Sequence, residues 1–301
     1  MQRLSREHTV PGPRRYQVYE PALLVEPGET ILVETINHMS PVVWSEADLA
    51  AHGSPEYRER EETGPIFVRG VRPGDTLAVR IEAIELVGLP HAHGSGPLAD
   101  AYPQRPRVFA IENGCCRLPG GAQVALAPMV GDIYTTPTVP DPVGVAHGGN
   151  MDFTEVRPGN TLYLPSFREG GLLVLGDVHA FQGDGEIFGE GGECAAEVTV
   201  MLDVNRTYRH PRPLVETPEC LIGLAQGEDL FASIQMAVRD MTVLAARGPW
   251  AAEGDKPRQA ALVRWVDFRE QLREVRLLLA HHRQIDEQPP HRQQHGEGQA
   301  S

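Results

Sequence analysis

Lysine is almost absent from this chain, which contains Lys256 alone among 301 residues. Because Lys256 stands in a polar stretch, hydrolytic mechanisms built on a Glu-Lys-Cys or Ser-Ser-Lys set have almost no support. The sequence also lacks GxSxG, which forms the nucleophile elbow of many serine hydrolases. It lacks GxxxxGK[ST] as well, the loop that binds nucleotide phosphates. These absences disfavour lysine-dependent, elbow-type serine and P-loop chemistry.

Cysteine is scarce too, and none of the four cysteines forms a CxxC pair. The adjacent Cys115 and Cys116 suit a disulfide poorly. We therefore expect reduced thiols that fill small apolar spaces, at these two positions and at Cys194 and Cys220. A nucleophilic Cys194 beside Glu193 is the alternative interpretation.

Long apolar runs are missing: none approaches the roughly 20 residues that span a bilayer. The N-terminal MQRLSREHTVPGPRRY is basic but has no apolar segment behind it, so we expect no secretory signal and a cytoplasmic location. The formal net charge of −14 disfavours nucleic acid and anionic membranes as partners, because both attract basic surfaces. The hydrophobic content of 41% is typical of a globular protein.

Short apolar or alternating runs separated by Pro-Gly turns fill residues 1–220, which we predict to be a β-rich catalytic region. Three turns, at 26–29, 72–75 and 157–160, share the pattern x-Pro-Gly-polar before an apolar run. Proline presets φ and glycine accepts the positive φ of a type II turn. The repetition fits either internal duplication or common turn chemistry. The pattern predicts a mainly β fold, sandwich-like or barrel-like.

Three further segments have their own composition. Residues 84–146 are rich in Pro, Gly and His, and we interpret them as an irregular insertion with short strands around Val124 to Leu126 and as a candidate lid. Apolar residues three and four positions apart predict an amphipathic helix at 228–247. A second predicted helix at 258–282 gives a helical region over 221–283, so the fold class is α+β overall. The polar residues 284–301 predict a disordered tail.

Residues 147–193 combine imidazole and carboxylate groups with many glycines. These groups are the usual ligands of Zn²⁺ and similar ions, and glycine allows sharp turns and close approach. Asp177 and His179 are two residues apart, so in a strand both project from one face and can bind one ion. The alternative is an Asp–His hydrogen bond at a strand end. The predicted metal ligands are His147, Asp152, Asp177 and His179.

The segments beside these ligands carry further polar groups. HGGNMD, at 147–152, predicts a tight loop that joins His147 to Asp152, although a purely structural turn has the same signature. The segment 182–186 holds two carboxylates, one of which could coordinate metal while the other transfers protons; each could equally be a solvated turn residue. The predicted catalytic carboxylates are Glu186, Glu193 and Asp184. The predicted substrate-binding residues are Gly148, Gly149, Asn150 and Gln182.

Several motifs together resemble the acetamidase/formamidase family. They are GPIFVRGVRPGDTLAVRI, HGGNMD, TLYLP, GDVHAFQGDGE and ETPECLIGLAQGEDLFASIQMAVRDM, and they cover the chain from about residue 20 to 246. The resemblance implies a metal-assisted hydrolase of small amides that is cytoplasmic and forms homodimers or higher homo-oligomers. The segment 267–290 departs from the helix and strand with which family members usually end. An oligomer contact that the family makes through those elements is therefore not expected of this chain.

The leading hypothesis is a metal-dependent hydrolase of small linear amides, with zinc as the expected ion and Ca²⁺ as the alternative. The metal would lower the pKa of bound water toward about 7. Glu186 or Glu193 would take the proton, and backbone N–H groups of Gly148 and Gly149 would bind the oxyanion.

Two rival functions remain open at this point: a non-catalytic β-sandwich with a closed Ca²⁺ site, since hard oxygen ligands suit Ca²⁺, and a scaffold without metal. His38 is a further candidate ligand from the N-terminal half. His91 and His93 form a second pair two residues apart, but no family motif supports them.

Overall fold

The computed structural model of the protein describes eleven segments, and every structural statement below concerns them. No helix among these residues is long and apolar enough to cross a membrane. The segments are 1–11, 17–37, 42–51, 61–92, 106–138, 146–186, 189–206, 209–227, 229–247, 261–265 and 275–280.

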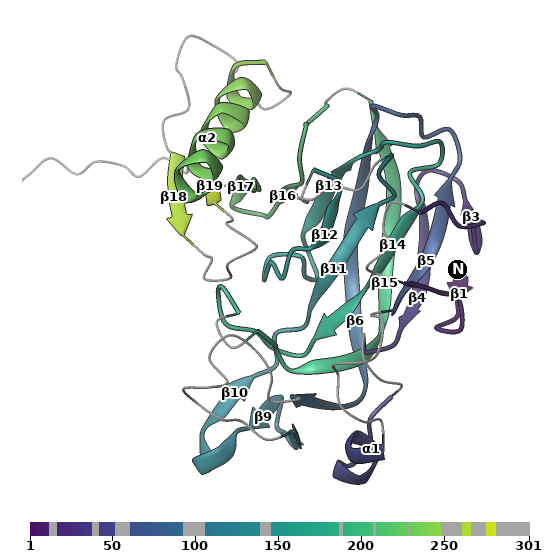
Figure 1. Ribbon diagram of the computed structural model, residues 1–301, viewed down its shortest axis with the longest axis vertical. Coiled ribbons are helices and arrows are strands. Elements are labelled where there is room, and N and C mark those ends of the chain that lie inside the picture. The colour runs from purple at the N-terminus through teal and green to yellow at the C-terminus, as the bar shows by residue number, and fades with distance from the viewer. Residues whose placement is uncertain are drawn as a thin grey trace, which may run out of the picture.

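Strands dominate the described residues (Figure 1). The two α-helices are α1 (Glu46–Ala51) and α2 (Leu230–Arg247), and a 3₁₀ turn covers Pro119–Gly121. The strands are β1 (Gln2–Leu4), β2 (Thr9–Pro11), β3 (Leu23–Val25), β4 (Glu29–Thr35), β5 (Glu61–Val68), β6 (Thr76–Ala92), β7 (Arg107–Val108), β8 (Ile111–Glu112), β9 (Cys115–Arg117), β10 (Gln123–Ala125), β11 (Met129–Thr135), β12 (Gly148–Asn150), β13 (Thr161–Pro165), β14 (Leu173–His179), β15 (Glu193–Asn205), β16 (Leu214–Glu216), β17 (Cys220–Gly223), β18 (Ala261–Trp265) and β19 (Val275–Ala280).

Most strands join one large sheet whose main path runs β12-β11-β14-β15-β6-β13-β16-β17-β19-β18, while β8, β9 and β10 form a small separate sheet. Buried side chains from β4, β5, β6, β11, β13, β14 and β15 meet in a single hydrophobic core. The sheets are not closed into a barrel, and α2 follows the strands near the C-terminal end. The predicted fold class, mainly β and sandwich-like with a C-terminal helical segment, is confirmed.

The three Pro-Gly turns adopt the predicted conformation. In each, the N–H of the fourth residue donates to the carbonyl of the first, at 3.2 Å in 26–29, 2.9 Å in 72–75 and 3.2 Å in 157–160. The glycines have φ of 84°, 86° and 93° respectively. This region of φ favours glycine, and it explains why the same residue recurs before β4, β6 and β13. Turn chemistry is therefore sufficient to explain the repetition, and internal duplication stays an alternative.

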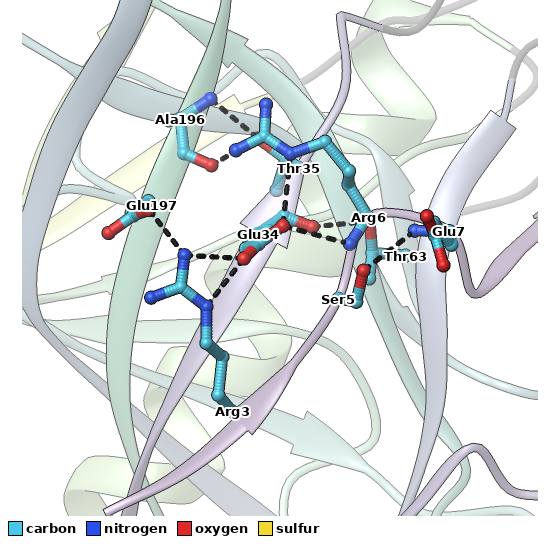
Figure 2. A network of polar contacts seen from close by, with 9 residues as sticks. All are labelled: Arg3, Ser5, Arg6, Glu7, Glu34, Thr35, Thr63, Ala196 and Glu197. Atoms are coloured by element: carbon cyan, nitrogen blue, oxygen red, sulfur yellow. Dashed lines mark hydrogen bonds and ion pairs between the residues drawn. The ribbon is translucent and has the colours of Figure 1, made fainter.

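An ion-pair network ties the N-terminal strand to the large sheet (Figure 2). Arg3 Nη2 contacts Glu34 Oε1 at 2.5 Å and Glu197 Oε1 at 2.7 Å, and Arg6 Nε donates to Glu34 Oε2 at 3.0 Å. The Thr63 hydroxyl donates to the backbone carbonyl of Glu34 at 2.8 Å. Burial acts to raise the pKa of Glu34, but the hydrogen bonds from Arg6 and Arg3 outweigh it and hold that pKa below its usual range.

We expect the Glu34→Gln variant to be less stable than the wild type at pH 7, with a difference that shrinks in acid. A carboxylate whose pKa is lower in the folded state contributes stability above its unfolded pKa, about 4.3, and this contribution disappears as the pH falls through the folded pKa. Urea midpoints at pH 7 and pH 3 test this expectation. Glu112→Gln, which removes an exposed pair with Arg117, should change neither midpoint. An equal deficit of Glu34→Gln at both pH values would contradict the account.

The predicted helix at 228–247 is confirmed as α2. Its buried residues include Ala237, Met241 and Leu244, and the last two pack against Leu214 and Leu221 of β16 and β17. Gly223 makes room for this contact, because a Cβ there would lie 2.6 Å from Met241 Sδ. The amphipathic spacing therefore identified both the helix and the face that covers the sheet.

The predicted helix at 258–282 is wrong: that segment contains β18 and β19, which pair with each other, and β19 extends the sheet from β17. The strands read ALVRW and VRLLLA, and such short apolar runs, each interrupted by one arginine, carry no period that distinguishes a strand from a helix. The hydrogen-bonding edge of β17 decides the outcome. The predicted disordered tail, 284–301, lies outside the described residues.

The segment 84–146 is also more regular than predicted. Its first part continues β6 to Ala92, and its last part contains β11, all of whose residues are buried. The predicted short strand near Val124 is present as β10. The insertion is thus limited to the stretch between β6 and β11, and its candidate role as a lid stays a prediction.

Candidate metal and active site

The end of β14 carries the first two site residues. His179 is the last residue of β14 and pairs in register with Glu193, the first residue of β15. Asp177 has a positive φ of 53°, a conformation that few non-glycine residues adopt and that often marks functional sites. His179 Nε2 lies 3.3 Å from Asp177 Oδ1 and 3.2 Å from Glu193 Oε1. All three side chains are buried.

Two overlapping groups of potential ligands share His179. Asp177, His179 and Glu193 form the first, and Asp152, His179 and Glu186 form the second; within each group the ligand atoms lie within 4.8 Å of one another. Asp152 and Glu186, like Asp177, have positive φ values. One imidazole nitrogen with several carboxylate oxygens is a donor set that suits divalent ions such as Zn²⁺. The residues present therefore fit a metal.

Gln182 fixes the orientation of His179. His179 Nδ1 and Gln182 Oε1 are 2.6 Å apart, so the ring donates from Nδ1 and turns Nε2 toward Asp177 and Glu193. Gln182 Nε2 also donates to the carbonyl oxygen of Asp152 at 2.6 Å. A partner that fixes the tautomer of a ligating histidine is a regular feature of metal sites. The hydrogen bond to His179 is compatible with this role for Gln182, and the substrate contact predicted from the sequence stays a prediction.

Two glycines leave the space in which these side chains meet. A Cβ at Gly131 of β11 would lie 2.7 Å from the Asp177 carbonyl oxygen and 2.9 Å from Asp152 Oδ1. A Cβ at Gly191 would lie 2.6 Å from His179 Nδ1. Neither glycine was a sequence candidate, because its function is only visible once the opposing strand is placed.

The carboxylates control the charge of His179. Burial alone would lower the pKa of His179, but the charges of Glu193 and Asp177 outweigh it and raise that pKa well above its usual range. Without a cation, the imidazole therefore keeps a proton that neutralises part of the buried acid. A divalent ion at the same place would replace this proton.

His147, a predicted ligand, belongs to neither group. It is buried, and its ring lies edge-on to the Tyr134 ring, with centroids 6.0 Å apart and planes at 86°. Gly148 and Gly149 are in β12 and pair with Tyr134 and Ile133 of β11. A Cβ at Gly148 would lie 2.3 Å from the Ile133 carbonyl oxygen, so this glycine is needed for close strand packing.

The remaining candidates are less central. Asn150 Nδ2 donates to Asp152 Oδ2 at 2.6 Å and so orients that carboxylate. Asp184 is exposed and accepts a hydrogen bond from the Thr154 hydroxyl at 3.2 Å, outside both groups. Of the other histidines, His91 is buried and its Nε2 lies 2.9 Å from Asn37 Nδ2, while His38 and His93 lie outside the described residues.

The alternative of a nucleophilic Cys194 is disfavoured. Its thiol is buried beside the Val87 carbonyl oxygen at 3.7 Å. Burial raises the pKa of Cys194 to about 12, so the thiolate required for attack is scarce at neutral pH.

Sequence reasoning missed three buried polar residues near β14. Glu62 of β5, Asp132 and Tyr134 of β11 are each about 1% exposed. Asp132 pairs in register with Gly176 and Asn150. No short motif marks these residues. For Asp132 and Tyr134 the available signal was a charged or phenolic residue within a largely apolar run, whereas Glu62 stands among polar residues at the start of β5.

The fold and the site define a β-rich protein with a buried histidine–carboxylate cluster that could hold a metal. Residues 134–223 match the Acetamidase/Formamidase family. The structure resembles an acetamidase from Bacillus halodurans, with 31% identity, a TM-score of 0.76 and coverage of 92% of this chain and 97% of that one. It also resembles a recombinant predicted acetamidase/formamidase from Thermoanaerobacter tengcongensis, with 29% identity, a TM-score of 0.79 and coverage of 93% and 95%. The chain belongs to the acetamidase/formamidase family.

A curated relative is more distant. A putative formamidase of Schizosaccharomyces pombe is 24% identical over 253 residues, which span 60% of this chain and 60% of that protein. The match thus covers less than two thirds of the relative's length.

Proposed function

We propose that this protein is a metal-dependent hydrolase of small linear amides that releases ammonia and a carboxylic acid. The observation that carries the proposal is the pair of ligand groups sharing His179, which lie within the stretch that matches the family. Names of the similar proteins, acetamidase and formamidase, agree with this substrate class. A structural metal site and a scaffold without metal are the readings that the experiments below must exclude.

The side chains divide into those that hold the ion and those that hold the ligands. When bound, a divalent ion would supply Lewis-acid polarisation of a carbonyl and acidification of water. Asp177, His179 and Glu193 would hold it, with Asp152 and Glu186 completing the site or holding a second ion. Gln182 keeps Nε2 of His179 directed at the cluster. We propose zinc, the ion most compatible with a mixed imidazole and carboxylate donor set, with Ca²⁺ as the oxygen-favouring alternative.

Metal analysis and ammonia release together test the function. Purified protein should carry about one or two divalent ions per chain and should release ammonia from formamide, acetamide or a related small amide in a panel that includes a lactam. Chelation should abolish release, and re-addition of one metal should restore it. Protein that holds metal but hydrolyses no amide would support a structural site, and protein without metal or activity would support a scaffold.

We expect Glu193→Gln and Glu186→Gln to lower metal affinity, because each carboxylate belongs to a ligand group. The sequence had assigned proton transfer to one of the two, and the geometry now favours ligation for both. Chelator competition measures the affinity of each variant. Asp184→Asn, which changes an exposed carboxylate outside both groups, should bind metal as the wild type does. Wild-type affinity in both glutamine variants would contradict the ligand assignment.

We also propose that the protein is cytoplasmic and assembles as a homodimer or higher homo-oligomer, as the family resemblance implies. Exposed apolar side chains on the outer face of α2, Phe231, Val238 and Val243, are compatible with self-association. Light scattering at several protein concentrations measures the state in solution, and a strictly monomeric protein would contradict the proposal.

A further inference from the structure

Glu62 comes from a strand that contributes to neither ligand group, and its side chain lies over Gly176, the residue before Asp177. It is the second residue of β5, and β5 pairs with β14 along the edge opposite β11. Its side chain passes over β14 at Gly176: a Cβ there would lie 3.1 Å from Glu62 Cγ and 3.2 Å from Glu62 Cα and Cβ. Gly176 immediately precedes Asp177. The missing side chain at this position therefore lets a carboxylate cross β14 beside the ligand cluster.

On the other side of β14 the carboxylate meets Tyr134 of β11. The phenol donates its hydrogen to Glu62 Oε2 at 3.1 Å, and both residues are about 1% exposed. The Tyr134 ring lies edge-on to the ring of His147, at the start of the segment that leads to Asp152. The Glu62–Tyr134 pair thus joins β5 and β11 to the segment that supplies one of the ligands.

Such a pair costs free energy relative to apolar residues of similar size, because a carboxylate and a hydroxyl must both leave water. The chemistry of the proposed reaction offers a reason for it. Amide hydrolysis needs a group that accepts and returns a proton, and a carboxylate that coordinates a cation is a poor proton acceptor. Asp152, Asp177, Glu186 and Glu193 all belong to the ligand groups. Glu62 and Asp132 are buried carboxylates on the two strands that flank β14 and belong to neither group, and Glu62 is the one that accepts the phenol hydrogen of Tyr134.

We propose that Glu62 is the proton-transfer group of the amidase and that Tyr134 is the residue that positions it; this inference rests on the proposed function. As a water oxygen forms its bond to the amide carbonyl carbon, Glu62 takes the proton released from that water. As the C–N bond breaks, Glu62 returns the proton to the amide nitrogen. Ammonia leaves, the carboxylic acid remains, and Glu62 is again a carboxylate. Tyr134 holds Oε2 of Glu62 through its phenol hydrogen bond.

Kinetics and metal binding measured on the same variants test this role. Glu62→Gln should lower kcat by about 10²–10⁴-fold, the usual range for general acid–base catalysis, with KM changed by less than about threefold. Tyr134→Phe keeps the ring and should lower kcat by about tenfold, the order of one lost hydrogen bond to a charged group. The double variant should be no slower than Glu62→Gln. Metal content and chelator-competition affinity should equal those of the wild type in all three variants, unlike in Glu193→Gln.

A second tyrosine–glutamate pair provides a matched control. Tyr163 of β13 donates to Glu216 Oε2 of β16 at 2.6 Å, and neither residue belongs to the site. Tyr163→Phe and Glu216→Gln remove the same kind of hydrogen bond, and both should keep wild-type kcat and metal content. Thermal unfolding of every variant separates a loss of folding from a loss of catalysis. If Glu62→Gln does not fold, the more conservative Tyr134→Phe variant tests the pair instead.

Each outcome decides between the inferences. A Glu62→Gln variant with kcat within twofold of the wild type overturns the proton-transfer role, whereas loss of metal from that variant makes Glu62 a ligand and overturns it too. Equal losses of kcat in the Tyr163 control would show a general effect of breaking such pairs. A wild-type protein that releases no ammonia from any amide refutes the proposed function itself. This result differs from a failure of the Glu62 role, in which the wild type is active and Glu62→Gln is equally active.

Discussion

The His179→Ala variant should lose its metal and its amidase activity together while remaining folded. His179 is the residue shared by both ligand groups, so its removal takes a ligand from each of them at once. Because a catalytic metal supplies several kcal/mol of transition-state stabilisation, we expect kcat/KM to fall by about 10³-fold or more. Metal analysis of the purified protein and ammonia release from the best amide measure the two losses.

The variant should still fold but with a lower unfolding midpoint, because the imidazole pairs with the buried Asp177 and Glu193 and its removal leaves their charges less compensated. Circular dichroism and unfolding of the metal-free wild type provide the reference for the variant. His8→Ala, on the exposed N-terminal arm, is the matched control and should keep both metal and activity. Survival of wild-type metal content in His179→Ala would show that the ion, if one binds, is held elsewhere.

The Gly131→Ala variant should have a large effect although it changes no chemical group of the site. The added methyl would stand 2.7 Å from the Asp177 carbonyl oxygen and 2.9 Å from Asp152 Oδ1, closer than nonbonded atoms normally approach. The backbone of β11, Asp152 or Asp177 must then shift, which disturbs the positions of two potential ligands. Displacement of groups that orient metal ligands costs about 10–100-fold in affinity or activity, and we expect a loss at the upper end of this range in chelator competition.

Gly183→Ala is the control for the glycine substitution itself. A Cβ at Gly183 meets no atom within 4 Å, and its φ is not in the positive range. This variant should bind metal with wild-type affinity. If Gly131→Ala also binds metal normally, the close approach of β11 to the carboxylates is not required for binding.

Local chemistry made several features readable from the sequence. The Pro-Gly turns before β4, β6 and β13 follow from the φ preferences of two residue types. Helix α2 follows from the spacing of Ala237, Met241 and their neighbours. The concentration of acids and imidazoles between 147 and 193 likewise marked the region of the site, because few other roles bring those groups together.

Segments without a distinctive period were not readable. The runs that form β18 and β19 were mistaken for a helix, since five or six mostly apolar residues fit either structure until a sheet edge is available. For the same reason β11 was hidden in a predicted insertion, although it supplies Gly131, Asp132 and Tyr134. A strand that is buried on both faces shows no alternation of apolar and polar residues.

The sequence by itself determined the mainly β class, the type II turns, helix α2 and the presence of a histidine–carboxylate site, because each depends on residue type and short-range spacing. Only the tertiary structure decided which acids share His179, that His147 stands apart from them, and that Glu62 crosses β14 at Gly176 to meet Tyr134. These contacts join strands far apart in the chain. They depend on the register between paired strands and on small residues, such as Gly176, in the neighbouring strand. The spacing of residues within one segment determines neither.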